Sequence, residues 1–222
     1  MTAAPRARKT KAQEAERIAA IFARFEAANP HPEGELEHRN LYTLLVAVVL
    51  SAQATDVGVN KATKALFQIA DTPQKMLALG EERLIDHIKT IGLFRAKAKN
   101  VIALSKLLVE RHGGEVPRDR EALQALPGVG RKTANVVMNI GFGEPTIAVD
   151  THVFRVSNRL ALTKGATVEA VEAGLERIVP ARFKQHAHHW LILHGRYVCK
   201  ARKPACGNCL VADLCSWPEK TA

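Results

Sequence analysis

The sequence predicts an all-α protein, and three observations support that fold class. Apolar residues recur three and four positions apart along most of the chain, which is the spacing of a helix with one buried face. Runs in which apolar and polar residues alternate, as in half-buried strands, are nearly absent. Turn-forming residues interrupt the apolar pattern at Asn29-Pro30, Gly113-Gly114, Pro127-Gly128 and Gly143 to Pro145. We therefore expect a series of helices separated by short turns.

The turn residues fix several helix ends. One helix is expected to stop before Asn29-Pro30 and another before Gly113-Gly114, while Pro127-Gly128 separates two short helices. Asp150 is a preferred N-cap residue and begins a further helix. In chain order the expected ranges are 12–28, 41–53, 57–69, 73–79, 81–90, 95–111, 120–125, 131–140, 151–160, 168–179 and 185–199.

The chain is strongly basic. Its 222 residues include 32 lysines and arginines against 22 aspartates and glutamates, for a formal net charge of +10 and a pI of about 9.7. Such an excess favours nucleic acid through counterion release, although basic proteins also bind acidic lipids or are simply well solvated. Hydrophobic residues make up 47% of the chain, which is enough for a substantial core in one large domain or two small ones.

The N-terminal segment is basic but lacks the apolar stretch of an export signal, so the protein is expected to stay inside the cell. The longest apolar run, Leu41 to Leu50, is too short to cross a bilayer, and no membrane partner is expected. Residues 1–11, with Arg6, Arg8, Lys9 and Lys11, are interpreted as a flexible basic arm. This arm either adds non-specific affinity for nucleic acid or is a solvated tail.

Residues 126–132 read LPGVGRK and form a short hairpin between two expected helices. Gly128 and Gly130 let another molecule approach the main chain closely, and the helix that begins at Arg131 has unpaired N–H groups at its positive end. Candidate phosphate contacts are therefore Leu126, Gly128, Gly130 and Arg131. Lys132 either contacts phosphate as well or acts as an amine nucleophile, whose neutral form the helix end and partial desolvation would favour.

Asp150 follows Lys132 by 18 residues, within the segment IAVDTHVFRV. Its position before a helix predicts an N-cap, and its carboxylate could also assist charge stabilisation or proton transfer. Both roles are compatible with one another. His152 could touch phosphate beside Asp150, or it could be a structural histidine on an apolar helix.

The four cysteines, Cys199, Cys206, Cys209 and Cys215, have the spacing C-x6-C-x2-C-x5-C near the end of the chain. In an intracellular protein they predict a metal or cluster site rather than two disulfides. Four thiolates suit either zinc or an iron–sulfur cluster, and the six-residue gap between the first two cysteines favours the larger group, the cluster. The loop KARKPA between the first two cysteines carries Lys200, Arg202 and Lys203, which either face phosphates together or form a solvated charge run.

Taken together and in this order, LLVAVVLSAQATD, LPGVGRKTANVV, AVDTHVFRV and the cysteine tail resemble the bacterial endonuclease III family, from about residue 12 to residue 217. These enzymes are bifunctional DNA glycosylases and abasic-site lyases of base excision repair that act on oxidised pyrimidines. The resemblance implies that Lys132 attacks C1′, forms a Schiff base and leads to β-elimination. It also implies that Asp150 stabilises positive charge on the sugar, and that the four cysteines hold a [4Fe-4S] cluster.

The resemblance further implies that Gln53 and Leu93 fill the hole left when the target nucleotide is flipped out of the duplex. The implied architecture has two helical domains with a DNA-binding cleft between them. A six-helix barrel at 34–144 contains the hairpin, and 12–33 with 145–222 forms the iron–sulfur cluster domain. Lys132 would then face Asp150 across the cleft. A monomer that binds double-stranded DNA is expected, in the bacterial cytoplasm and associated with the nucleoid.

Related glycosylases specific for adenine or thymine mismatches replace the catalytic lysine, so Lys132 favours the bifunctional enzymes. Two alternatives from another class are a non-catalytic DNA-binding or redox-signalling protein and a zinc-stabilised DNA-binding module. Lys132 and Asp150 disfavour the non-catalytic protein, because neither residue is needed merely to hold phosphate. The colour of the purified protein tests the zinc-stabilised module, because a [4Fe-4S] protein is yellow-brown and a zinc protein is colourless.

Overall fold

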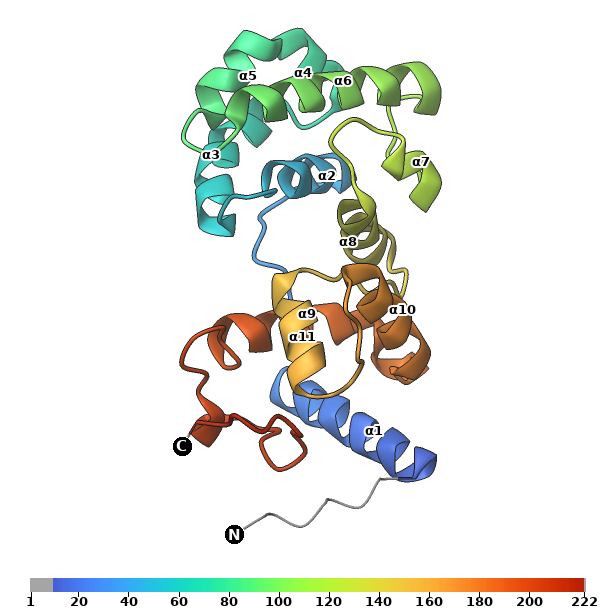
Figure 1. Ribbon diagram of the computed structural model, residues 1–222. Helices are drawn as coiled ribbons and strands as arrows, with labels where there is room; N and C mark the ends of the chain where they lie inside the picture. The colour runs from blue at the N-terminus through green and yellow to red at the C-terminus, as the bar shows by residue number, and fades with distance from the viewer. Residues whose placement is uncertain (1–9, 222) are drawn as a thin grey trace. The chain divides into compact units, whose positions relative to one another are not determined.

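The computed structural model describes residues 10–221, and every regular element in this range is a helix, which confirms the all-α prediction. The chain divides into two compact units (Figure 1). We call Glu33–Ala148 the central unit, and the described parts of Met1–Pro32 and Val149–Ala222 the split unit. The predicted basic arm, residues 1–11, lies outside the described residues except for Thr10 and Lys11, which begin the first helix.

The central unit contains seven α-helices in its described sequence. Its core is one large apolar cluster with a smaller one formed by Leu44, Val48, Val136 and Ala148. The long helix α6 packs against α4 and α5, while α2 packs against α3 and α8 (Figure 1). Its largest fully buried side chains include Leu45, Leu50, Leu66, Met76, Leu84, Ile88, Leu104 and Leu108. The bounds are α2 Leu41–Leu50, α3 Asp56–Ile69, α4 Pro73–Leu79, α5 Glu81–Ile88, α6 Phe94–His112, α7 Arg120–Gln124 and α8 Arg131–Phe142.

Side-chain caps and left-handed glycines explain several helix ends in the central unit. Asn40, Thr55, Thr72 and Asp119 each accept a hydrogen bond from a first-turn N–H group, at the starts of α2, α3, α4 and α7. At Gly113, φ is +61°, so this residue ends α6 at the place where the Gly113-Gly114 pair predicted an end.

The predicted end of the second helix at residue 53 is wrong. Helix α2 ends at Leu50, and residues 51–54 form a turn in which the Ala54 N–H donates to the Ser51 carbonyl. The Ser51 hydroxyl donates to the Val48 carbonyl at 2.8 Å, which satisfies an acceptor in the last helical turn. Gln53 therefore lies in a turn with φ +54° instead of at the end of a helix.

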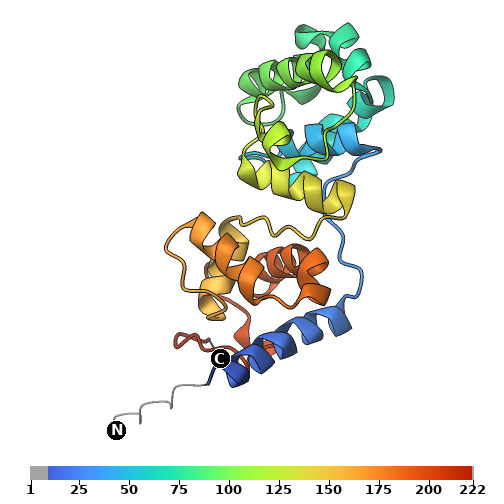
Figure 2. The same ribbon diagram turned by 90° about the vertical axis from the view of Figure 1, so that its right-hand side faces the viewer.

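The split unit joins the start of the chain to its end. Its elements are α1 Lys11–Ala28, α9 Thr151–Arg159, α10 Val168–Ile178, the 3₁₀ helix η1 Ala181–Phe183, α11 Lys184–Tyr197 and the 3₁₀ helix η2 Cys206–Asn208. Figure 2 shows α1 running alongside the C-terminal segment. Buried Arg17 of α1 donates to the carbonyls of Leu160, Ala161 and Leu214. Phe22, Phe183 and Trp190 form an aromatic core with ring centroids 5.9 to 6.4 Å apart.

Helices α9 and α11 of the split unit approach each other closely. A Cβ added to Gly195 would lie 2.8 Å from the Cβ of His152, so only glycine fits at this crossing. The predicted helix 185–199 is shorter at its end than expected, since α11 stops at Tyr197, and η1 precedes it without a sequence signal. Within the described chain, no helix combines the length and the apolar character that crossing a membrane requires.

Candidate functional site

The predicted hairpin joins α7 to α8 in the central unit. The Val129 N–H donates to the Leu126 carbonyl at 3.1 Å and closes the turn. Gly128 has φ +78°, and a Cβ there would lie 3.0 Å from the Cβ and the Nδ2 atom of Asn100. Glycine is therefore required at this position by both backbone conformation and space.

The first turn of α8 presents its amides without a side-chain cap. Gly130 is the N-cap and supplies no side chain, so this helix end suits an anion. Arg131 and Lys132 are both exposed there. The Leu126 side chain is only 4% exposed and packs in the core, so this residue offers only its backbone to a ligand.

Asp150 caps α9 in the split unit, as predicted. Its Oδ1 atom accepts hydrogen bonds from the backbone N–H groups of His152 and Val153, each at 2.8 Å. Asp150 is half-buried, and these two hydrogen bonds fix the direction of its carboxylate. His152 is also half-buried, and its Nδ1 lies 3.2 Å from Nη2 of Arg155. Asp150 belongs to the split unit, whereas Lys132 belongs to the central unit.

Gln53 and Leu93, the two predicted wedge residues, lie on neighbouring turns of the central unit. A Cβ added to Gly92 would lie 3.8 Å from the Gln53 carbonyl oxygen, so the two turns are in contact. Both residues have left-handed backbones, with φ +54° for Gln53 and +57° for Leu93, which is uncommon for residues other than glycine. Leu93 is 60% exposed. The two turns thus combine strained backbones with an exposed large apolar side chain.

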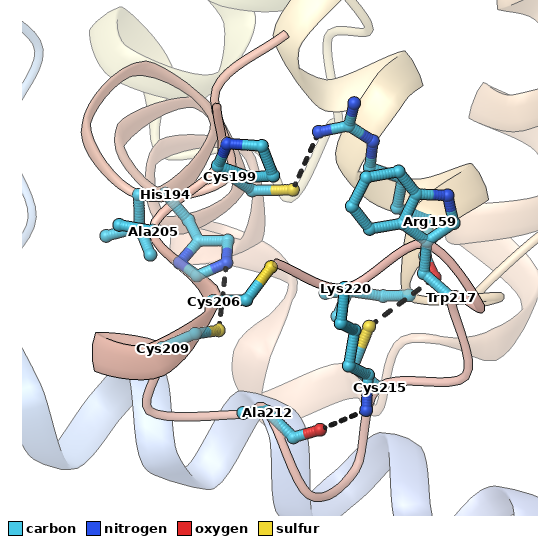
Figure 3. A pocket seen from close by; sticks show the side chains of 13 residues that line it. Arg159, His194, Cys199, Ala205, Cys206, Cys209, Ala212, Cys215, Trp217 and Lys220 are labelled. Carbon is cyan, nitrogen blue, oxygen red and sulfur yellow. Dashed lines mark hydrogen bonds between the residues drawn. The ribbon is translucent and has the colours of Figure 1, made fainter. Parts of the chain in front are cut away.

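The four cysteines line one pocket of the split unit, together with Arg159, His194, Trp217 and Lys220. Figure 3 shows their sulfur atoms around a common space. All four cysteines are half-buried, and none is in a disulfide. The Sγ of Cys209 lies 3.7 Å from Nε2 of His194. Burial lowers the pKa of His194 to about 4, so its imidazole is neutral near pH 7.

The pocket fits an iron–sulfur cluster. Four free thiols surround it, and polar groups touch the sulfur atoms, as expected around cluster ligands. In residues 10–221, no three His, Cys, Asp or Glu side chains are gathered tightly enough to hold one metal ion.

The predicted basic loop begins directly after Cys199. Lys200, Arg202 and Lys203 are all exposed, and Lys203 has a left-handed backbone with φ +51°. A hydrogen bond from the Ala205 N–H to the Val198 carbonyl, at 2.9 Å, joins the two ends of the loop. The three cations therefore project from one short, closed loop.

Comparison with known proteins agrees with the helical fold, the hairpin and the thiol pocket. Residues 46–181 match the HhH-GPD superfamily of base excision DNA repair proteins, and residues 199–215 match the iron–sulfur binding domain of endonuclease III. These features define a helix-hairpin-helix DNA repair glycosylase. The chain belongs to the endonuclease III family.

Two relatives and two solved structures illustrate this similarity. The chain is 60% identical over 198 residues to endonuclease III of Treponema pallidum (strain Nichols), covering 89% of this chain and 94% of the relative. It is 59% identical to endonuclease III of Escherichia coli (strain K12), covering 90% and 95%. A trapped endonuclease III–DNA covalent intermediate matches with a TM-score of 0.85 at 47% identity, covering 91% and 95%. A thermostable thymine-DNA glycosylase matches with a TM-score of 0.82 at 26% identity, covering 93% and 98%.

This family membership establishes the class of activity. The chain is a DNA glycosylase of base excision repair with abasic-site lyase activity, it binds DNA, and its cofactor is a [4Fe-4S] cluster. Sequence reasoning missed several residues beside the candidate sites, among them Asn100, which lies under Gly128, and Arg159, which touches Cys199. Both are polar residues on helices whose sequence pattern gives no sign of their contacts.

Proposed function

We propose that this enzyme removes oxidised pyrimidines from duplex DNA through a Schiff base on Lys132. The Nζ atom attacks C1′, the glycosidic bond breaks, and the base leaves with a proton. The sugar ring opens to an imine, loss of a C2′ proton then breaks the C3′–O bond, and water releases the enzyme. The observation that carries this proposal is the exposed amine of Lys132 in the uncapped first turn of α8, directly after the hairpin.

We assign Asp150 to charge stabilisation during loss of the base and to proton transfer. Its backbone hydrogen bonds hold the carboxylate in one direction while leaving it half-exposed. In this proposal the domain of residues 34–144 supplies the hairpin and Lys132. The domain formed by residues 12–33 and 145–222 supplies Asp150 and the cluster, and DNA contacts both.

The remaining proposed contacts divide into two groups. Gln53 and Leu93 enter the duplex where the nucleotide leaves, which accounts for their exposed, left-handed turns. The phosphate contacts proposed here come from the hairpin, from α9 and from the basic loop. They are Leu126 through its backbone, Gly128, Gly130, Arg131, His152, Lys200, Arg202 and Lys203.

We propose Cys199, Cys206, Cys209 and Cys215 as the cluster ligands, since all four line one pocket. The bound cluster would stabilise a segment that has little apolar core of its own. The enzyme is proposed to act as a monomer in the bacterial cytoplasm, associated with the nucleoid.

Borohydride trapping on a duplex with one oxidised pyrimidine tests the role of Lys132. The wild-type protein should give a covalent protein–DNA adduct, and Lys132→Gln should give none. Lys106→Gln, which removes an exposed lysine elsewhere in the central unit, should trap like the wild type. An undamaged duplex should give no adduct with any variant. Equal trapping by Lys132→Gln would remove the nucleophile assignment.

A further inference from the structure

Arg159, the last residue of α9, lies between the cluster pocket and the basic loop. Its Nη1 atom donates to the Sγ of Cys199 at 3.6 Å and to the Lys200 carbonyl at 2.6 Å, and its Nη2 donates to the Ala201 carbonyl at 3.1 Å. Figure 3 shows the guanidinium directed at the Cys199 sulfur. One side chain thus binds three consecutive residues, the first of which is a proposed cluster ligand.

The indole of Trp217 covers the other side of this guanidinium. The Arg159 Cζ lies 4.0 Å from the ring centroid, within the range of a cation–π contact. Arginine is suited to this place because its planar fork can stack on a ring while its N–H groups donate in fixed directions. A lysine could neither stack in this way nor reach two carbonyls and a sulfur with the same geometry.

The basic loop depends on external support for its shape. The bond between Ala205 and Val198 joins its ends, and the left-handed backbone at Lys203 is unfavourable for a residue with a side chain. Arg159 holds the part that lies before this strained residue. Without it, the carbonyls of Lys200 and Ala201 lose a shared donor and the three cations of the loop lose their fixed spacing.

We propose that Arg159 is a positioning residue for DNA binding. It uses Cys199 as a fixed point and holds the first half of the basic loop, so that Lys200, Arg202 and Lys203 meet phosphates together. The proposal rests on the proposed function, in which this loop contacts DNA. It assigns Arg159 no contact with DNA and no part in the chemical step.

The test compares cluster-loaded variants for binding to a duplex with a non-cleavable abasic-site analogue at several salt concentrations. Arg159→Met should raise Kd by about five- to tenfold and lower the salt slope by about one to two. Arg159→Lys keeps the charge but should still bind several-fold more weakly. Arg182→Met is the matched control, because Arg182 is an exposed arginine stacked on Phe183, and its Kd should stay within about twofold of wild type.

Two further measurements separate positioning from general damage. The single-turnover rate at saturating DNA should be unchanged in Arg159→Met, since only binding depends on the loop. A variant with Lys200→Gln, Arg202→Gln and Lys203→Gln should bind weakly by itself. Adding Arg159→Met to that variant should weaken binding by less than about twofold, because residues that act together are not additive.

The outcomes distinguish the two proposals. If the triple loop variant binds weakly and Arg159→Met binds normally, the positioning role is refuted and the loop contact stands. If the triple variant binds like the wild type, the loop contact in the proposed function is refuted, and the positioning role with it. Cluster content is followed by iron content and visible absorbance. If both Arg159→Met and Arg159→Lys cannot keep the cluster, Arg159 serves cluster retention and the positioning role is refuted.

Discussion

Replacing Asp150 by alanine and by asparagine separates its capping role from its proposed chemical role. In the structure, a single oxygen, Oδ1, accepts from two backbone N–H groups at the start of α9, each at 2.8 Å. Alanine removes this acceptor and the charge together. Asparagine keeps an oxygen in place and removes only the charge. Both substitutions abolish the carboxylate that the proposed mechanism uses.

The expected stability changes follow from these contacts. Loss of an N-cap side chain costs about 1 kcal/mol, and loss of a negative charge beside a helix N-terminus costs about 0.5 kcal/mol more. We therefore expect Asp150→Ala to lower the free energy of unfolding by about 1.5 kcal/mol and Asp150→Asn by about 0.5 kcal/mol. In a chain of this length these values correspond to Tm decreases of about 3–6 °C and about 1–2 °C. Loss of the carboxylate should slow both variants by about 100-fold or more.

Thermal unfolding and single-turnover base excision on one damaged duplex measure the two effects, with cluster absorbance recorded for each sample. The expected pattern is unequal Tm values and equally low rates. If asparagine lowered Tm as much as alanine, the capping argument would be wrong. If asparagine retained more than about a tenth of the wild-type rate, the chemical role of the carboxylate would be refuted, since general acid–base catalysis contributes far more than that factor.

Three further substitutions test other parts of the structure. Gly128→Ala should destabilise the protein by about 1–2 kcal/mol and weaken DNA binding, because φ is +78° and the new Cβ would press on Asn100; unchanged Tm and Kd would contradict this. Burial, aided by His186, lowers the pKa of His189 to about 4 from its usual 6.5, so the unfolded chain binds a proton that the folded chain excludes. Stability should therefore fall as pH decreases from about 6.5 to 4, and denaturant titrations of His189→Gln should show a flatter slope. Tyr42→Phe should cost about 1 kcal/mol in urea unfolding, because the lost hydroxyl binds the Ser105 hydroxyl at 2.6 Å; a loss above about 3 kcal/mol would contradict the assignment.

Local chemistry made much of the fold predictable. The end of α6 follows from a left-handed glycine, and the start of α9 follows from the capping oxygen of Asp150, which is a contact between near neighbours. The cysteine spacing predicted a shared pocket, because closely spaced ligands need few other constraints to meet. In each case the deciding residues lie close together along the chain, at most 16 positions apart for the cysteines.

The features that could not be predicted depend on distant contacts. Gln53 and Leu93 take left-handed backbones without glycine, and the turns that carry them touch across 40 residues of sequence. Nothing near Leu126 distinguishes a leucine that faces a ligand from one that fills the core. In the sequence, Arg159 resembles any charged residue at a helix end. Its hydrogen-bond partners begin at Cys199, which lies 40 residues later. Sequence periodicity reports which face is buried, but it does not report what that face meets.

The contacts between α1 and the end of the chain impose an order on folding during synthesis. Arg17 donates to the carbonyls of Leu160 and Leu214, which lie 143 and 197 residues further along. Helix α1 is synthesised early, but it can pack only after its partners near the end of the chain have been synthesised. The central unit is continuous in sequence, so it can fold while the rest of the chain is still being synthesised. All four cysteines emerge after the central unit. Insertion of the cluster is thus a late step in the maturation of the protein. It occurs in a chain whose central unit can already be folded.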